Sequence, residues 1–148
     1  MKSLSEIDIV SKRASRAAGY SWGISEEVGK NIRLLEMFGL PGIQNLNFFL
    51  KIKNDLKLEN LIIISKENKA TTSQFCPIIA GVSFLDQIKT LENVENIKII
   101  NISYPILFLP FVSRASEVIG KRIIVKIKDK EFLLNFNNSI YSNFFKND

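Results

Sequence analysis

The sequence predicts an α+β fold, in which a helical N-terminal half of three helices packs on a small mixed sheet that ends in a C-terminal β-hairpin. Apolar residues recur at three- and four-residue intervals through residues 1–54, which is the period of an amphipathic helix. β-Branched runs replace that period in residues 55–148 and are typical of strands. With 148 residues and no low-complexity linker, the chain predicts one globular domain, 1–148, made of these two halves.

Residues Ser3 to Ala18 are predicted to form the first helix. Ser3 and Glu6 have the spacing of a capping box, and Gly19 is placed to end the helix in a left-handed conformation. The apolar stripe that we expect to face the core consists of Leu4, Ile7, Val10, Ala14 and Ala17.

A second helix is predicted to begin at Ser25, whose hydroxyl can cap the first amides. Its buried face is expected to contain Val28, Ile32, Leu35 and Phe38. Gly29 lies in mid-helix, where glycine costs about 1 kcal/mol relative to alanine unless another backbone comes close, so it indicates tight helix packing. After stop signals at 39–42, a third helix is predicted over Ile43–Lys53.

In the second half, strands are predicted over Leu61–Ile64, Ile97–Ile102 and Ile123–Ile127. The polar stretch Lys66–Ser73 predicts a loop, and Pro77–Gln87 fits either a short apolar helix or a buried loop.

The remaining C-terminal elements are one helix and a hairpin. Ile106–Ile119 predicts a helix that Pro110 kinks or delays. Lys121–Lys128 and Glu131–Phe136 predict the two strands of the hairpin, and residues beyond Asn137 are expected to form a surface tail.

Composition limits the location and the partners. The N-terminus lacks the apolar core of a signal peptide, and the longest apolar run, 104–112, is about half of a membrane span, so the sequence predicts a cytoplasmic protein without a membrane partner. The net charge of +5 suits an anionic partner. Lysine, asparagine and isoleucine are frequent throughout, as in proteins of AT-rich genomes, and arginines and exposed aromatics are few, so nucleic acid is not the favoured partner.

The side-chain inventory narrows the chemistry. The absence of histidine removes the usual general base, the commonest zinc ligand and every Ser-His or Cys-His triad. Cys76 precedes Pro77 among apolar residues, which indicates a buried inert thiol and not a nucleophile. The sequence therefore predicts neither a metal nor a cofactor.

The best candidate site is the turn Gly19–Gly23, called the elbow below, with its flanking helices. It can offer backbone amides and an aromatic face to an anionic or planar ligand, while arginines neutralise the anion and glutamates serve as acid or base. In the alternative, Trp22 packs in the core and the arginines pair with the glutamates. The candidate ligand-binding residues are Arg13, Arg16, Tyr20, Ser21, Trp22, Glu26 and Glu27.

A second candidate is the apolar segment Tyr104–Phe111, followed by Ser113, Arg114 and Glu117, where a pocket is one interpretation and a core helix with one exposed ion pair is the other. A third interpretation is an exposed apolar patch suited to a homo-oligomer. That patch would contain Phe108, Phe111, Tyr141, Phe144 and Phe145.

Several segments together resemble an uncharacterised proteobacterial family, domain of unknown function 3726. The most specific is Gly19–Gly23 with the acidic helix start that follows, and the likeness extends over most of the chain. The other segments are Leu4–Ile7, Arg13–Ala18, Glu26–Lys30, Gly39–Gly42, Cys76–Gly81, Asp86 and Pro105–Phe111. The resemblance implies no activity and no catalytic residue.

These observations predict an accessory module that binds a small ligand or a partner protein. The alternative is a metal-independent enzyme that uses carboxylate and arginine chemistry on a small acidic metabolite. Its site would use Arg16, Glu26, Glu27 and Asp86.

Overall fold

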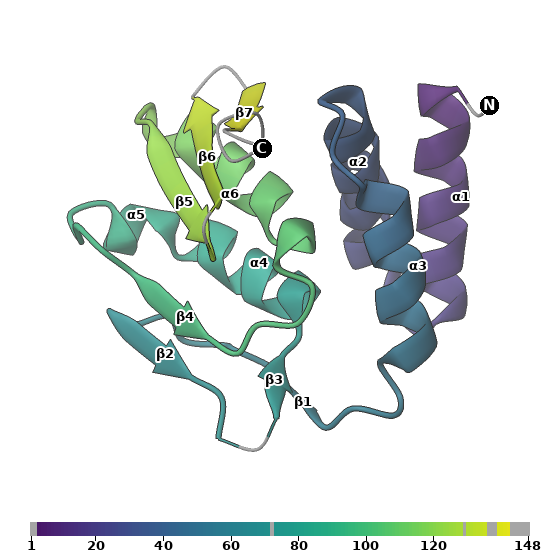
Figure 1. Cartoon of the computed structure of the whole chain (residues 1–148), viewed down its shortest axis with the longest axis horizontal. Helices are drawn as coiled ribbons and strands as arrows, with labels where there is room; N and C mark the ends of the chain where they lie inside the picture. The colour runs from purple at the N-terminus through teal and green to yellow at the C-terminus, as the bar shows by residue number, and fades with distance from the viewer. Residues whose placement is uncertain (1–2, 72, 129, 136–138, 143–148) are drawn as a thin grey trace.

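The computed structural model describes residues 3–71, 73–128, 130–135 and 139–142. Three helices, α1 (Leu4–Ala17), α2 (Trp22–Met37) and α3 (Gly42–Ile52), stand side by side next to the mixed half of the chain (Figure 1). The predicted α+β class and its three N-terminal helices are therefore confirmed. Phe136, Phe144 and Phe145, for which we predicted a strand end and aromatic contacts, lie outside the described residues.

Helix α1 begins and ends as predicted, but it buries a different face. Ser3 accepts a hydrogen bond from the Glu6 amide at 3.2 Å, and Gly19 has φ +105° just past the helix end. The predicted apolar stripe is wrong beyond Ile7, because Val10 is 45% exposed and Ala14 and Ala17 are exposed. The buried positions are instead Ile7, Ser11 and Ser15. Small serines let α1 lie close to α2, and this proximity, more than apolarity, determines which face is covered.

Helix α2 begins four residues earlier than predicted. Ser21 has an extended backbone and its hydroxyl accepts the Ile24 amide at 3.2 Å, so Ser21 is the cap and Trp22 and Gly23 are already helical. Ser25, the predicted cap, is fully buried inside the helix. The chain turns at Gly19 and Tyr20, so the first serine after that turn reaches the free amides. The predicted buried face of Val28, Ile32 and Leu35 is confirmed, with Phe38 half-buried.

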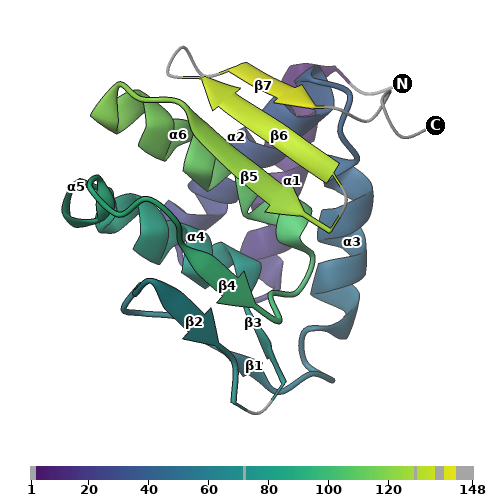
Figure 2. The ribbon, with the colours of Figure 1, turned by 60° about the vertical axis from the view of Figure 1, so that its left-hand side comes forward.

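The mixed half contains short parallel pairs and one antiparallel sheet (Figure 2). Strand β1 (Leu58–Glu59) pairs with β3 (Gln74–Phe75), β2 (Glu67–Lys69) pairs with β4 (Lys98–Ile100), and Phe75 bridges to Ile102. Helices α4 (Pro77–Asp86) and α5 (Ile88–Leu91) connect β3 to β4, which resolves the undecided segment 77–87 as a helix. The antiparallel sheet has the order β5 (Ile123–Ile127), β6 (Lys130–Asn135), β7 (Ser139–Ser142).

The predicted strand Leu61–Ile64 is wrong, because this segment is irregular. Leu61 and Ile64 are buried, whereas Ile63 is 78% exposed. The Gln87 side chain fixes the backbone, since it accepts the Ile64 amide at 3.0 Å and donates to the Ile62 carbonyl at 2.5 Å. A side-chain amide thus takes the place of the partner strand on which a β-branched run depends.

Strands also form where a loop and a tail were predicted. The predicted loop 66–73 contains β2, because the buried Asn68 side chain donates to the Lys98 carbonyl at 3.0 Å and accepts the Ser65 amide at 2.9 Å. In the predicted tail, β7 pairs with β6 and Ile140 is buried. The predicted hairpin itself is confirmed, with Ile127 opposite Lys130.

A short 3-10 turn, η1 (Pro105–Leu107), precedes α6 (Leu109–Ile119), so the helix predicted over 106–119 is present and delayed to the region of Pro110. Helix α6 lies against β5 and β6 on one side and α4 and α2 on the others. Phe108 and Phe111 are buried there, so the predicted exposed aromatic patch is wrong for these two residues. Fully buried side chains from both halves meet in one hydrophobic core that includes Leu35, Phe49, Leu109, Phe111 and Leu134.

Within the ranges that the structure describes, no helix combines the length and the apolar composition that a membrane crossing requires.

Candidate functional site

Trp22 is exposed at the elbow, and two cations lie against it. Its side chain is 59% exposed, so the alternative in which it packs in the core is wrong. Lys12 Nζ is 5.6 Å and Arg16 Cζ is 5.2 Å from the centroid of its ring. As the first residue of α2, Trp22 points back along the helix axis toward the end of α1. Lys12, Arg16 and Trp22 are called the elbow cluster below.

Tyr20 fixes the elbow to the rest of the fold. Its hydroxyl is 3.5 Å from Cys76 Sγ at the start of α4, and Lys53 Nζ, just after α3, is 4.9 Å from the centroid of its ring. Its carbonyl accepts a hydrogen bond from Arg16 Nη1 at 3.0 Å, and Ser25 Oγ lies 3.5 Å from the same oxygen. Tyr20 therefore holds α1, α2, α3 and α4 at one point.

Burial raises the pKa of the Tyr20 hydroxyl above its ordinary value, and the neighbouring Cys76 thiol raises it further through charge and hydrogen bonding. A tyrosine in the unfolded chain has a pKa of about 10. Above that pH the unfolded state has released a proton that the folded state still holds, so folding stability must fall as pH rises.

We expect Tyr20→Phe to reduce this alkaline loss of stability, because phenylalanine has no proton to release. Urea unfolding at neutral pH and at pH values above about 10 measures the effect. The free energy of unfolding should fall less steeply with pH in the variant than in the wild type. Parallel curves for the two proteins would mean that Tyr20 does not titrate differently in the folded and unfolded states.

The other predicted residues of the elbow differ in their availability. Arg13 and Glu26 are exposed, on α1 and α2 respectively. The Ser21 hydroxyl is occupied as the helix cap. Lys12 was missed by the sequence analysis, although its position four residues before Arg16 places both on one side of α1.

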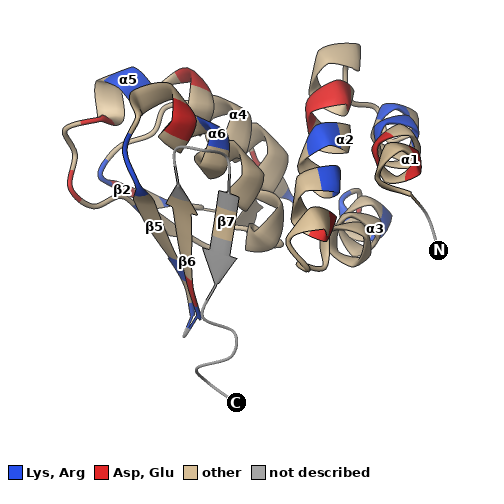
Figure 3. Cartoon of the chain, turned by 90° about the horizontal axis from the view of Figure 1, so that it is seen from above, with Lys and Arg blue, Asp and Glu red and all other residues tan. Residues whose placement is uncertain are grey.

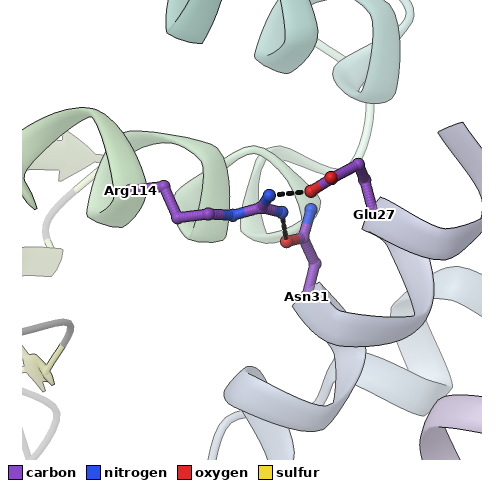
Figure 4. Close-up of polar contacts among 3 residues, drawn as sticks. All are labelled: Glu27, Asn31 and Arg114. Carbon is purple, nitrogen blue, oxygen red and sulfur yellow. Dashed lines mark hydrogen bonds and ion pairs between the residues drawn. The ribbon is translucent and has the colours of Figure 1, made fainter. Parts of the chain in front are cut away.

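Glu27 does not belong to the elbow cluster, because it pairs with Arg114 of α6 (Figure 4). The second guanidinium nitrogen of Arg114 bonds Asn31 Oδ1, one turn further along α2. The Arg114 guanidinium also lies 5.5 Å from the centroid of the Phe111 ring. Burial lowers the pKa of Arg114 below its ordinary value, and the charge of Glu117 opposes that shift. Arg114 therefore connects α6 to α2, and the alternative in which Glu27 pairs with the arginines of α1 is wrong.

The second predicted region, Tyr104–Phe111, does border a cavity. A space of about 160 Å³ lies between α3, η1 and the β5–β6 hairpin. Its lining residues are Asn45, Pro105, Ile106, Ile127, Lys130 and Phe132, so Arg114 and Glu117 do not line it. A second cavity of about 10 Å³, room for about one water, adjoins the buried Asn31.

The four residues of the enzyme hypothesis, Arg16, Glu26, Glu27 and Asp86, are not equally free to contact a substrate. Glu27 is engaged by Arg114, and Asp86 is exposed at the end of α4, a helix that packs on α5, α6 and η1. No group of three or more acidic or cysteine side chains suited to a metal ion occurs among the residues described.

The N-terminal half also carries the family signal. Residues 2–76 match the model of the family described as "Protein of unknown function (DUF3726)". The chain belongs to the DUF3726 family. No curated protein and no solved structure matches the chain. The DUF3726 match contains the elbow, the elbow cluster and Cys76, whereas Arg114 and the β5–β6–β7 sheet lie beyond it.

Proposed function

We propose that this DUF3726 protein is a partner-binding module and that its elbow cluster receives an acidic segment of a partner protein. The observation that carries the proposal is the 59% exposed Trp22 with Lys12 and Arg16 within 6 Å of its ring. An exposed indole is a rigid contact surface of the kind that dominates protein interfaces.

The chemistry of the cluster suits carboxylates. The Arg16 guanidinium can bind a carboxylate through forked hydrogen bonds, and Lys12 adds a second positive charge beside it. Gly23, next to Trp22, has nothing within 4 Å of the position that a Cβ would occupy, so this side of the first turn of α2 faces open space. An extended acidic segment can lie across the indole with its carboxylates on the two cations.

The shape of the surface favours a partner protein over a metabolite. Metabolite sites are usually concave, with volumes of about 300–1,000 Å³. The two best-formed cavities of the described residues have volumes of about 160 and 10 Å³, and neither is lined by residues of the elbow cluster. The enzyme alternative has less support, because Glu27 is engaged elsewhere and Glu26 would be the remaining acid on that side of α2.

The single tryptophan makes the test direct, since Trp22 emission reports on the elbow alone. We expect an acidic decapeptide of glutamate and aspartate with one tyrosine to change that emission in a saturable way. Arg16→Ala should lower the affinity for the acidic peptide by about tenfold, which corresponds to about 1.4 kcal/mol of binding free energy. Glu26→Gln should raise the affinity for the acidic peptide, because this change removes an exposed negative charge four residues after Trp22.

Two controls make the result interpretable. A peptide with lysine in place of the acidic residues should leave the emission unchanged, and Lys51→Ala on the exposed side of α3 should bind like the wild type. Equal affinity of the wild type and Arg16→Ala, or equal responses to the acidic and basic peptides, would refute the assignment.

A further inference from the structure

Strand β5 leaves one edge of the antiparallel sheet without a partner. In the order β5–β6–β7, β5 is an outer strand, and among residues 3–71, 73–128, 130–135 and 139–142 only β6 pairs with it (Figure 2). All five of its residues keep an unbroken register, from Ile123 opposite Leu134 to Ile127 opposite Lys130. The edge therefore has neither the bulge nor the proline that commonly protects an edge strand.

The register shows which backbone groups face outward. Ile127 and Lys130 close a two-residue connection, and in such hairpins the closing pair exchanges hydrogen bonds. Alternation along an antiparallel strand then directs the N–H and C=O groups of Ile123, Val125 and Ile127 toward β6. Those of Ile124 and Lys126 point away from β6, toward the open edge.

The side chains of β5 leave apolar surface on both sides of that edge. Ile123, Val125 and Ile127, on the α6 side of the sheet, are only half-buried, and Ile124 on the opposite side is 61% exposed. A strand added to the edge can cover the half-buried side chains with its own alternate residues, as in recognition by strand addition.

The positive charge around β5 favours an acidic added strand. Residues 121–131 carry five basic and two acidic side chains, and Glu92, whose carboxylate lies 3.1 Å from Lys121 Nζ, lowers the local net charge from +3 to +2. Basic positions lie at both ends of β5 (Figure 3), and Arg122, Lys126 and Lys128 are exposed. The Lys126 ammonium is 3.9 Å from Glu131, with 73% and 51% of the two side chains exposed, so this pair leaves the lysine accessible.

The same charges disfavour a second copy of this chain as the occupant. An antiparallel pair of two β5 strands centred on Val125 would place Arg122 opposite Lys128 of the other copy, and like charges opposite each other destabilise a sheet. An acidic strand meets no such repulsion.

We propose that the open edge of β5 binds an extended, acidic segment of a partner protein by strand addition, with aliphatic and acidic residues alternating along that segment. This surface is separate from the elbow cluster and lies outside the residues matched by the family.

The experiment uses the full chain labelled with ¹⁵N and a decapeptide of alternating glutamate and valine. Addition of the peptide should slow hydrogen exchange at the amides of Ile124 and Lys126, which point outward, in the wild type and equally in Arg16→Ala, where the elbow cluster is weakened. A peptide of alternating lysine and valine should cause no protection. Protection of these two amides before any peptide is added would show that the edge is already occupied and would overturn the proposal.

Two variants separate strand addition from simple charge attraction. Lys126→Pro removes an outward N–H without removing a bond to β6, and should abolish the protection of the Ile124 amide by the acidic peptide. The double variant Arg122→Glu/Lys126→Glu keeps the backbone groups of the edge and reverses two of its charges. Its affinity for the acidic peptide should fall by at least about tenfold, and it should bind the basic peptide instead. The double variant Lys51→Glu/Lys57→Glu, which makes the same charge change at two exposed lysines outside the sheet, is the matched control and should bind like the wild type.

Protection of the Ile124 amide that survives Lys126→Pro in a folded protein would show that strand addition is not the mode of binding. If Lys126→Pro does not fold, the double charge variant decides, and an unchanged preference for the acidic peptide would refute the proposal. Concentration-dependent dimerisation of the wild type that the acidic peptide does not displace would identify a second copy as the occupant. Loss of binding in Arg16→Ala would trace the peptide to the elbow cluster and also refute the β5 assignment.

Discussion

Replacing Gly81 by alanine should lower the free energy of unfolding by about 3 kcal/mol, because the new methyl group has no room. A Cβ built on Gly81 would lie 2.5 Å from Cγ and 2.7 Å from Cε2 of the Phe111 ring. Gly81 is on α4 and Phe111 on α6, so the collision occurs where two buried helices cross. Phe111 is 1% exposed and adjoins a cavity of only about 10 Å³, so the ring cannot move aside without disturbing the core.

Urea unfolding measures this change, and the melting temperature should fall by roughly 6–12 °C for a chain of this size. Gly23→Ala is the matched control, because its Cβ would meet nothing within 4 Å and alanine favours the helix. That variant should be as stable as the wild type or slightly more stable. A second variant, Gly81→Ala with Phe111→Leu, should recover part of the loss. Equal stability of Gly81→Ala and Gly23→Ala would contradict the close contact between α4 and α6.

The features that sequence predicted well are those set by neighbouring residues. The Ser3 cap, the turn at Gly19 and the β5–β6 hairpin each depend on chemistry within a few positions, and all three are present. Gly29 also gave a correct signal, because a mid-helix glycine has a cost that a close helix contact can explain.

The features that sequence missed depend on distant partners. Leu61–Ile64 has strong β propensity, but the Gln87 side chain takes up two of its backbone groups. Asn68, a polar residue, is buried in β2 because its amide joins Ser65 to Lys98. No pattern of neighbouring residues predicts such long-range contacts.

The candidate site shows the same division. The elbow residues Tyr20 and Trp22 and the neighbouring Arg16 of α1 could be found from glycine spacing and residue type, and the structure brings these three together. The exposure of Trp22 could not be found, because it depends on α2 beginning at Trp22 and not at Ser25. The pairing of Glu27 with Arg114 joins two helices far apart in the sequence, so sequence assigned Glu27 to the wrong site.

Gly29→Ala should cost about 2 kcal/mol of stability and also disturb the elbow cluster. A Cβ at Gly29 would lie 2.7 Å from the backbone oxygen of Asp8 and 3.3 Å from Lys12 Cβ, so α1 must move away from α2. An overpacking cost of about 3 kcal/mol is partly offset by the gain of about 1 kcal/mol from alanine in a helix. Because Lys12 and Arg16 belong to α1 and Trp22 belongs to α2, the displacement of α1 should separate the two cations from the indole.

The two consequences of Gly29→Ala have separate measurements. Urea unfolding gives the stability, and the emission of Trp22 reports its surroundings in the folded protein, because cations near the ring centroid interact with the indole. Arg33→Ala, an exposed change on the same helix, should alter neither. A destabilised Gly29→Ala protein with unchanged emission would show that α1 and α2 adjust elsewhere, whereas changes in both would mean that the close crossing at Gly29 is what holds the elbow cluster in its binding geometry.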